Sequence, residues 1–154
     1  MLQARAIWAA PCRQPICWQL CTFITCVYAR PSLTGARLQA RDFRVLVMIG
    51  DGELQEGSNW EAAMAAAHQR VANLTAILDY NKVQQSGSVE TMMSLEPVAD
   101  KWRAFGWEVR EIDGHDMAQI VATLDALPLA ADKPSIIIAH TVKGKGASFA
   151  ENNY

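Results

Sequence analysis

Apolar residues form four short runs between residues 44 and 142, and polar or turn-forming residues separate the runs. The intervening stretches repeat apolar side chains every three or four positions, which is typical of amphipathic helices. Strand and helix patterns therefore alternate with a repeat of about 30 residues, the length of a βαβ unit. This alternation predicts an α/β fold, a parallel sheet with helices on both faces. The predicted strands cover residues 44–49, 74–80, 107–112 and 134–142.

Local chemistry predicts where three of the helices start. Ser58 is followed three residues later by Glu61, which is the spacing of a capping box. Asp116 is expected to cap the helix that follows it, and Pro97 to occupy the first position of another. The alanine-rich segment 59–70 is predicted to be a helix whose small residues suit close packing against a partner.

The 154 residues suffice for one domain, and their net charge of −2 is unevenly distributed. Residues 1–41 hold five arginines and no Asp, Glu or Lys, whereas the rest of the chain holds nine basic and 16 acidic residues. The basic segment is rich in Trp, Cys, Ile and Leu, unlike the lysine-rich or polar arms that bind nucleic acid. We therefore expect no nucleic-acid partner.

The same segment contains all four cysteines and a long apolar run. The cysteine spacings match no Cys-x-x-Cys metal pattern. Residues 42–154 contain no cysteine, which suits a reducing cytoplasm, where we expect the protein to act. The apolar run 15–29 is shorter than the ~20 residues of a membrane-spanning helix, so we expect no membrane span. A secretory signal is the alternative interpretation of this run. The cysteines are Cys12, Cys17, Cys21 and Cys26.

Polar residues follow the first two predicted strands. Gly50, Asp51 and Gly52 come after the first strand, and Asn81 follows the second, 30 residues after Asp51. The carboxyl ends of parallel strands meet at one edge of a sheet, so both side chains should reach that edge. Carboxylate and amide oxygens suit Mg²⁺ or Ca²⁺, and Mg²⁺ commonly completes its shell with phosphate oxygens. A metal and diphosphate site is one interpretation, and an ordinary turn beside a solvated loop is the other.

Longer motifs around these positions resemble a known family. The runs "GDGELQEGSNWEAAMAAA" and "NLTAILDYNKVQQSG" are similar to the thiamine diphosphate signature of the transketolase family. The runs "EVREIDGHD" and "KPSIIIAHTVKGKGASFAENN" also resemble that family, particularly the N-terminal subunit of split transketolases. The resemblance extends from about Gly35 to Tyr154 and implies the diphosphate-binding domain of a thiamine-diphosphate-binding fold.

The resemblance assigns roles to five residues. Asp51, the Asn81 side chain and the Val83 carbonyl would bind Mg²⁺ or Ca²⁺, and Gly52 would contact the diphosphate of thiamine diphosphate. Glu56 corresponds to an acid near the subunit interface, although a solvated carboxylate that favours the following helix is the simpler alternative. The implied activity is transfer of a two-carbon ketol unit between sugar phosphates, as in the pentose phosphate pathway. No catalytic residue is assigned.

The chain departs from the family pattern at its start. Residues 1–34 replace a glycine-rich loop and an alanine-rich helix of the family, so this segment is interpreted as foreign to the fold, and residues 35–154 as a partial cofactor-binding domain. The pyrimidine-binding domain is not encoded, so we expect a partner domain or subunit in a homo- or hetero-oligomer and no activity alone. The alternatives are another thiamine diphosphate enzyme, of deoxyxylulose-phosphate synthase or 2-oxo acid dehydrogenase type, and a non-catalytic remnant.

The three histidines receive structural roles. His68 is expected at the surface or in packing, and His115 in a turn before a helix. His140 precedes a glycine-containing loop in which Lys143 and Lys145 could meet phosphate or simply face solvent.

Overall fold

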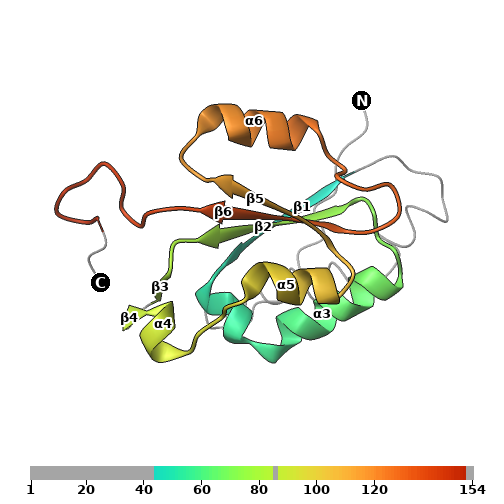
Figure 1. The fold of residues 1–154 in the computed structure, drawn as a ribbon, viewed down its shortest axis with the longest axis horizontal. Helices are drawn as coiled ribbons and strands as arrows, with labels where there is room; N and C mark the ends of the chain where they lie inside the picture. The colour runs from blue at the N-terminus through green and yellow to red at the C-terminus, as the bar shows by residue number, and fades with distance from the viewer. Residues whose placement is uncertain (1–43, 85–86, 152–154) are drawn as a thin grey trace, which may run out of the picture.

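The computed structural model describes residues 44–84 and 87–151, so the segment 1–34 lies outside the described residues. The described chain alternates strands and helices in the predicted order, as Figure 1 shows. The strands of the main sheet are β1 (Val45–Gly50), β2 (Leu74–Tyr80), β5 (Glu108–Asp113) and β6 (Ser135–His140). The helices are α3 (Gly57–His68), α4 (Val89–Met92), α5 (Val98–Ala104) and α6 (Met117–Asp125). A 3-10 turn, η1 (Gly52–Gln55), follows β1, and a two-stranded ribbon, β3 (Val83–Gln84) with β4 (Gly87–Ser88), follows β2.

The main sheet is entirely parallel and has the strand order β1-β2-β6-β5. The four predicted strand segments are these four strands, which confirms the predicted fold class. The last strand, β6, lies between β2 and β5. The two central strands are buried almost throughout because neighbouring strands and covering layers surround them, whereas β1 and β5 at the edges are partly exposed.

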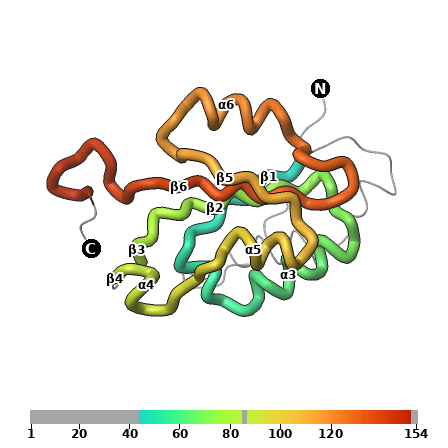
Figure 2. Tube along the Cα trace, viewed as in Figure 1, coloured from blue at the N-terminus to red at the C-terminus, as the bar shows by residue number. Residues whose placement is uncertain are grey.

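Helices cover both faces of the sheet, as predicted. Helices α3 and α5 lie on one face and α6 lies on the other, an arrangement visible in the ribbon and in the trace (Figures 1 and 2). The larger core lies under α3 and α5 and includes Trp102 and Trp107. A smaller cluster lies on the α6 side and includes Ile112 and Ile137.

The alanines of α3 face the protein's own core. Ala62, Ala63 and Ala66 are fully buried in the larger cluster. Their small side chains let the helix pack closely on the sheet. The expectation that these residues present a face to a partner is therefore wrong, because the sheet of the same domain already covers them.

The predicted capping box at Ser58 and Glu61 is also wrong. Helix α3 begins at Gly57, so Ser58 lies inside its first turn, and Glu61 is exposed. The backbone of the preceding turn stabilises the helix start instead: the Asn59 N–H donates to the Glu56 carbonyl at 3.1 Å, and Asn59 Nδ2 donates to the Glu53 carbonyl at 2.6 Å. Because η1 leads almost directly into α3, a capping hydroxyl has no role there.

The other two predicted helix starts have different outcomes. Asp116 caps α6 as predicted, and its side chain accepts hydrogen bonds from the backbone of Ala118 and Gln119. Pro97 occupies the cap position before α5, one residue earlier than predicted. The Glu96 side chain accepts a hydrogen bond from the Val98 N–H at 3.0 Å, so this carboxylate provides a hydrogen-bond acceptor at the start of the helix.

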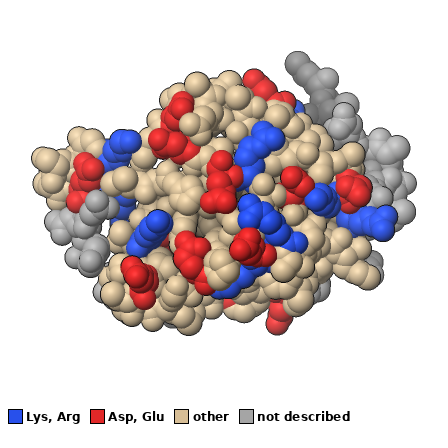
Figure 3. Space-filling model, in the orientation of Figure 1, with Lys and Arg blue, Asp and Glu red and all other residues tan. Residues whose placement is uncertain are grey.

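Acidic and basic side chains are interspersed on the face shown in Figure 3. The ion pairs between Arg103 and Asp100 and between Lys133 and Glu108 are exposed to solvent. Each such pair contributes about 0–1 kcal/mol, because water screens it. Within the described ranges 44–84 and 87–151, no helix is long and apolar enough to cross a membrane.

Candidate functional site

The loops that follow β1 and β2 meet at the carboxyl edge of the sheet. Gly50 pairs with Asp79 in the parallel register, and each strand then ends within one residue. The Lys82 backbone N–H donates to Asp51 Oδ2 at 2.6 Å across this junction. The structure therefore brings the Asp51 carboxylate against the turn that contains Asn81.

Asp51 is a buried carboxylate, with 2% of its surface exposed. Burial raises the pKa of Asp51, and the nearby Asp79 acts in the same direction. The backbone N–H groups of Lys82 and Gly52 and the charge of Lys143 partly offset this increase in pKa. A buried carboxylate whose ionised form is disfavoured is a natural site for a cation, because a bound cation stabilises that form.

Asn81 forms a tight turn with the two residues that follow it. Its Oδ1 accepts a hydrogen bond from the Val83 N–H at 3.0 Å, and its Nδ2 donates to Asp79 Oδ2 at 3.3 Å. Lys82 has a φ of 63°, in the left-handed region. Asn side chains stabilise such turns by bonding to the backbone two residues later. The turn presents an amide oxygen at the edge where Asp51 lies.

Gly52 and Gln84 form the other side of the site. A Cβ at Gly52 would lie 3.6 Å from Gln84 Cγ, so the Gln84 side chain lies directly beside this glycine. Gln84 Nε2 is buried, and no residue in the described part of the chain accepts its hydrogen bond. A buried donor without an acceptor is costly, and a ligand with acceptor oxygens would satisfy it.

These groups fit a divalent cation that is bound together with a phosphate group. The structure places a carboxylate and an amide oxygen at this edge, and the predicted third ligand is a backbone carbonyl, all of which suit Mg²⁺ or Ca²⁺. Within residues 44–84 and 87–151, no three His, Cys, Asp or Glu side chains form a metal-binding group. A metal at this edge would therefore depend on Asp51 together with the neutral oxygens of Asn81 and Val83.

Several contacts at the site were not predicted from the sequence. Glu53, which had no assigned role, accepts a hydrogen bond from the Gly50 N–H at 2.8 Å and so closes the loop after β1. Asp79 accepts a hydrogen bond from the Thr141 hydroxyl in addition to the one from Asn81. The only sequence signal for Asp79 was an acidic residue near the end of an apolar run, which does not reveal its partners.

Tyr80 links the carboxyl end of β2 to the segment before α5. Its hydroxyl donates to Glu96 Oε1 at 2.7 Å. Burial and this hydrogen bond raise the pKa of Tyr80, and the same hydrogen bond lowers the pKa of Glu96. Lys82 Nζ lies 5.5 Å from the centroid of the Tyr80 ring. These contacts hold the chain on both sides of the Asn81 turn in one arrangement.

The structure places the three histidines in separate environments. His68 is exposed and His115 lies in the turn before α6, as predicted. His115 Nε2 also accepts a hydrogen bond from the Val142 N–H at 2.8 Å, which fixes the start of the loop after β6. His140 lies 3.1 Å from Glu111 and contacts the Tyr80 ring edge to face. In the loop itself, Lys143 is exposed, as is Lys145.

Glu56 lies at the cap position of α3, directly after η1. It is partly buried, and among the described residues its side chain makes no hydrogen bond to the helix start. Its predicted role at a subunit interface remains a prediction.

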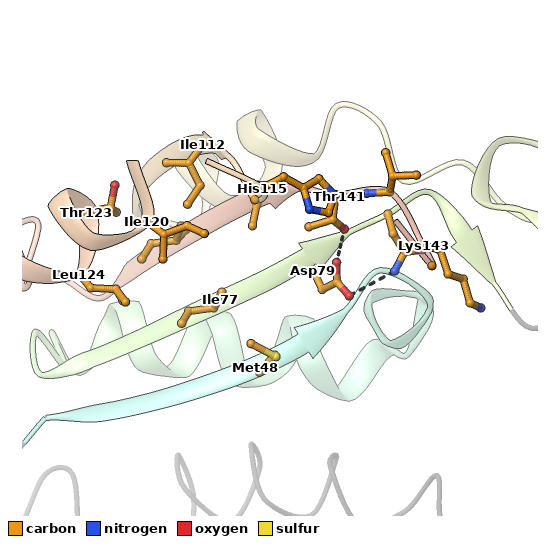
Figure 4. A pocket seen from close by; sticks show the side chains of 16 residues that line it. Met48, Ile77, Asp79, Ile112, His115, Ile120, Thr123, Leu124, Thr141 and Lys143 are labelled. Carbon is orange, nitrogen blue, oxygen red and sulfur yellow. Dashed lines mark hydrogen bonds between the residues drawn. The ribbon is translucent and has the colours of Figure 1, made fainter. Parts of the chain in front are cut away.

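A cavity of about 580 Å³ opens beside the site on the α6 face of the sheet. Figure 4 shows apolar side chains such as Ile77 and Ile120 along this cavity, and Asp79, Thr141 and His115 at its polar end. Met48 of β1 also lines the cavity and is 65% exposed. The polar site at the edge of the sheet therefore adjoins a largely apolar cavity.

The sequence matches a known family. Residues 25–154 match the family described as transketolase, thiamine diphosphate binding domain. The match covers most of the chain and includes all the site residues described above.

Two curated relatives are subunits of transketolases. The chain is 50% identical over 107 residues to a 6-deoxy-6-sulfo-D-fructose transketolase subunit from Clostridium sp. (strain MSTE9), a match that covers 70% of this chain and 39% of the relative. It is 45% identical over 116 residues to an apulose-4-phosphate transketolase subunit from Phocaeicola vulgatus, with coverage of 75% and 41%. The chain thus spans about two fifths of the length of these relatives.

Solved structures of transketolases share the fold. The transketolase from Campylobacter jejuni superposes with a TM-score of 0.70 at 32% identity, over 88% of this chain and 21% of that one. A transketolase from Pichia stipitis, solved as a complex with sedoheptulose 7-phosphate, gives a TM-score of 0.68 at 30% identity, over 86% and 19%. The chain belongs to the transketolase family, in which it corresponds to the thiamine-diphosphate-binding domain.

Proposed function

We propose that this chain is the part of a transketolase that binds Mg²⁺ and the diphosphate of thiamine diphosphate. Asp51, Asn81 and the carbonyl of Val83 hold the cation, and Gly52 approaches the diphosphate. The observation that carries this proposal is the buried Asp51 carboxylate held against the Asn81 turn at the carboxyl edge of the sheet. Ca²⁺ would fit the same oxygens.

In the proposed assembly, each residue of the site has a limited task. The cation offsets the buried charge of Asp51 and screens the diphosphate from nearby acids. Gly52 lets the backbone come close to a phosphate because it has no side chain. When bound, thiamine diphosphate supplies the carbon nucleophile for ketol transfer between sugar phosphates, and the protein supplies binding and orientation.

The proposal includes a partner. A domain or subunit that binds the pyrimidine end of the cofactor would complete the site, and Glu56 would lie toward that partner in a homo- or hetero-oligomer. Both curated relatives carry the word subunit in their names, which supports an assembly of separate chains. We propose that the isolated chain is inactive and that the assembly acts on sugar phosphates in the cytoplasm, in pentose phosphate metabolism.

The binding proposal is tested by calorimetric titration with thiamine diphosphate, with and without Mg²⁺. We expect binding that requires the cation and that weakens at least about tenfold in Asp51→Ala and Asn81→Ala, since ligand residues dominate affinity. Asp132→Ala changes an exposed loop carboxylate away from the site and serves as the control. Equal binding by all four proteins would refute the assignment of the site.

The partner proposal needs a second assay. The chain is mixed with a transketolase subunit that binds the pyrimidine end of the cofactor, and ketol transfer between sugar phosphates is measured. We expect activity only in the mixture. Activity of the chain alone would refute the proposal that a partner completes the site.

A further inference from the structure

The Asn81 side chain has one favoured amide orientation in this structure. Its oxygen faces the Val83 N–H, and its nitrogen faces a carboxylate oxygen of Asp79. A rotation of the amide by 180° would place the NH₂ group against the Val83 N–H and the oxygen against the carboxylate. Both contacts would then be repulsive, so the two neighbours together select the observed orientation.

Asp79 is itself held from the opposite direction. Its Oδ1 accepts a hydrogen bond from the Thr141 hydroxyl, which Figure 4 shows, and its Oδ2 accepts the one from Asn81. Thr141 directly follows β6, and its backbone N–H donates to the Tyr80 carbonyl at 3.3 Å. Both oxygens of the partly buried carboxylate are therefore engaged, and a rotation of the Asp79 side chain about its Cα–Cβ bond would break both bonds.

We propose that Asp79, fixed by Thr141, is a positioning residue that keeps the amide oxygen of Asn81 available to a cation. This inference rests on the proposed function, because it assigns a purpose to the orientation of a residue in that site. The chain of contacts runs from β6 through Thr141 and Asp79 to Asn81. It couples the loop after β6 to the edge where Asp51 lies.

The physical basis is the difference between the two ends of an amide. An amide oxygen has lone pairs that bind a hard cation, whereas an amide nitrogen carries two hydrogens and repels it. Without Asp79 as acceptor, only the Val83 N–H would select the orientation. Residues that orient metal ligands in this way change metal affinity by about 10–100-fold when they are removed.

The test uses the full chain and four variants, two at Thr141, one at Asp79 and one control. Thr141→Val removes the hydroxyl but keeps the shape of the side chain, and Thr141→Ser keeps the hydroxyl. Asp79→Asn removes the charge and one acceptor. Thr123→Val is the matched control, since Thr123 is a buried threonine that lines the same cavity on α6.

The first readout needs no ligand. The side-chain amide signals of Asn81 in a ¹⁵N–¹H correlation spectrum, assigned by their loss in Asn81→Asp, report the environment of Nδ2. We expect these signals to move in Thr141→Val and in Asp79→Asn, and to stay in place in Thr141→Ser and Thr123→Val. Unchanged signals in both Thr141→Val and Asp79→Asn would overturn the proposal, and using both keeps the test decisive if one variant fails to fold.

The second readout is the calorimetric affinity for thiamine diphosphate with Mg²⁺. We expect about tenfold weaker binding in Thr141→Val and recovery in Thr141→Ser. A wild-type chain that binds no cofactor would count against the proposed function, while the Asn81 signals would still decide the positioning role. Moved signals with unchanged affinity would overturn the role of the orientation in binding.

Discussion

Trp107 and Trp102 form a matched pair that tests how α3 is held to the rest of the domain. Both indoles are buried, and their ring centroids lie 4.8 Å apart. Trp107 Nε1 donates to the Ala63 carbonyl at 2.9 Å, whereas Trp102 Nε1 has no acceptor among the described residues. Replacing each tryptophan with phenylalanine removes similar ring volume, but only one replacement removes a hydrogen bond.

The expected costs follow from these contacts. Loss of indole volume costs about 1–2 kcal/mol at either position, by comparison with larger truncations in cores. Trp107→Phe also loses a buried hydrogen bond, which adds about 1–2 kcal/mol. Trp102→Phe instead removes a buried donor that lacks an acceptor, which offsets part of its cost. We therefore expect about 3 kcal/mol for Trp107→Phe and about 1 kcal/mol or less for Trp102→Phe.

Urea unfolding followed by circular dichroism at 222 nm measures the difference, because the far-ultraviolet signal of the helices changes little with tryptophan content. With a slope of about 1–2 kcal/mol per molar urea for a domain of this size, the two midpoints should differ by about 1–2 M. Equal slopes for the two variants would show that unfolding exposes a similar surface area in both, so that their midpoints can be compared. Coincident midpoints, or a lower midpoint for Trp102→Phe, would refute the argument from hydrogen bonding.

Three further predictions concern the edge of the sheet. Gly114→Ala would place a Cβ 3.1 Å from the carbonyl oxygen at the end of β6 and should cost about 1–3 kcal/mol by thermal unfolding, whereas Gly57→Ala, which has open space, should cost little. Tyr80→Phe should cost about 1 kcal/mol at pH 7 after allowance for solvent screening of Glu96. The hydrogen bond from Tyr80 lowers the pKa of Glu96 below its ordinary 4.5. The full cost of Tyr80→Phe should therefore appear above pH 4.5, and it should fade as the pH drops through the lower pKa of Glu96 in the folded state. Urea unfolding at pH 7 and pH 3 measures this change, and an equal cost at both pH values would contradict the linkage. Asp51→Asn should raise the unfolding free energy of the ligand-free chain at pH 7, since burial raises the pKa of Asp51 and penalises its charge. At a ligand concentration 100 times the wild-type Kd, it should reduce the ligand's stabilisation from about 2.7 kcal/mol to about 1.4 kcal/mol or less.

The sequence pattern was sufficient for the architecture. Four apolar runs became the four strands of a parallel sheet, and helices cover both of its faces. These features depend on the periodicity of apolar residues, which is a local property of the chain. The cap at Asp116 was predictable for the same reason, since its partners lie within three residues.

Local patterns were insufficient at the start of α3. The predicted capping box has the right residue types, but the helix begins at Gly57, because the turn before it already supplies an acceptor for the Asn59 N–H. The alanines of this helix were likewise interpreted as a surface for a partner. Small residues allow close packing against any neighbour, and only the folded structure shows that the neighbour is the domain's own sheet.

At the site, the sequence alone determined that Asp51 and Asn81 follow successive strands, and parallel strand order then places both at one edge. The contacts that hold Asn81 came only from the tertiary structure. Thr141 lies 62 residues from Asp79 and reaches it because β6 pairs with β2 rather than adding beyond β5. Residue types do not specify which strands become neighbours, since that choice depends on how all the helices and strands pack together. The sequence therefore determined which side chains reach the edge, and the order of the strands decided which of them hold one another in place.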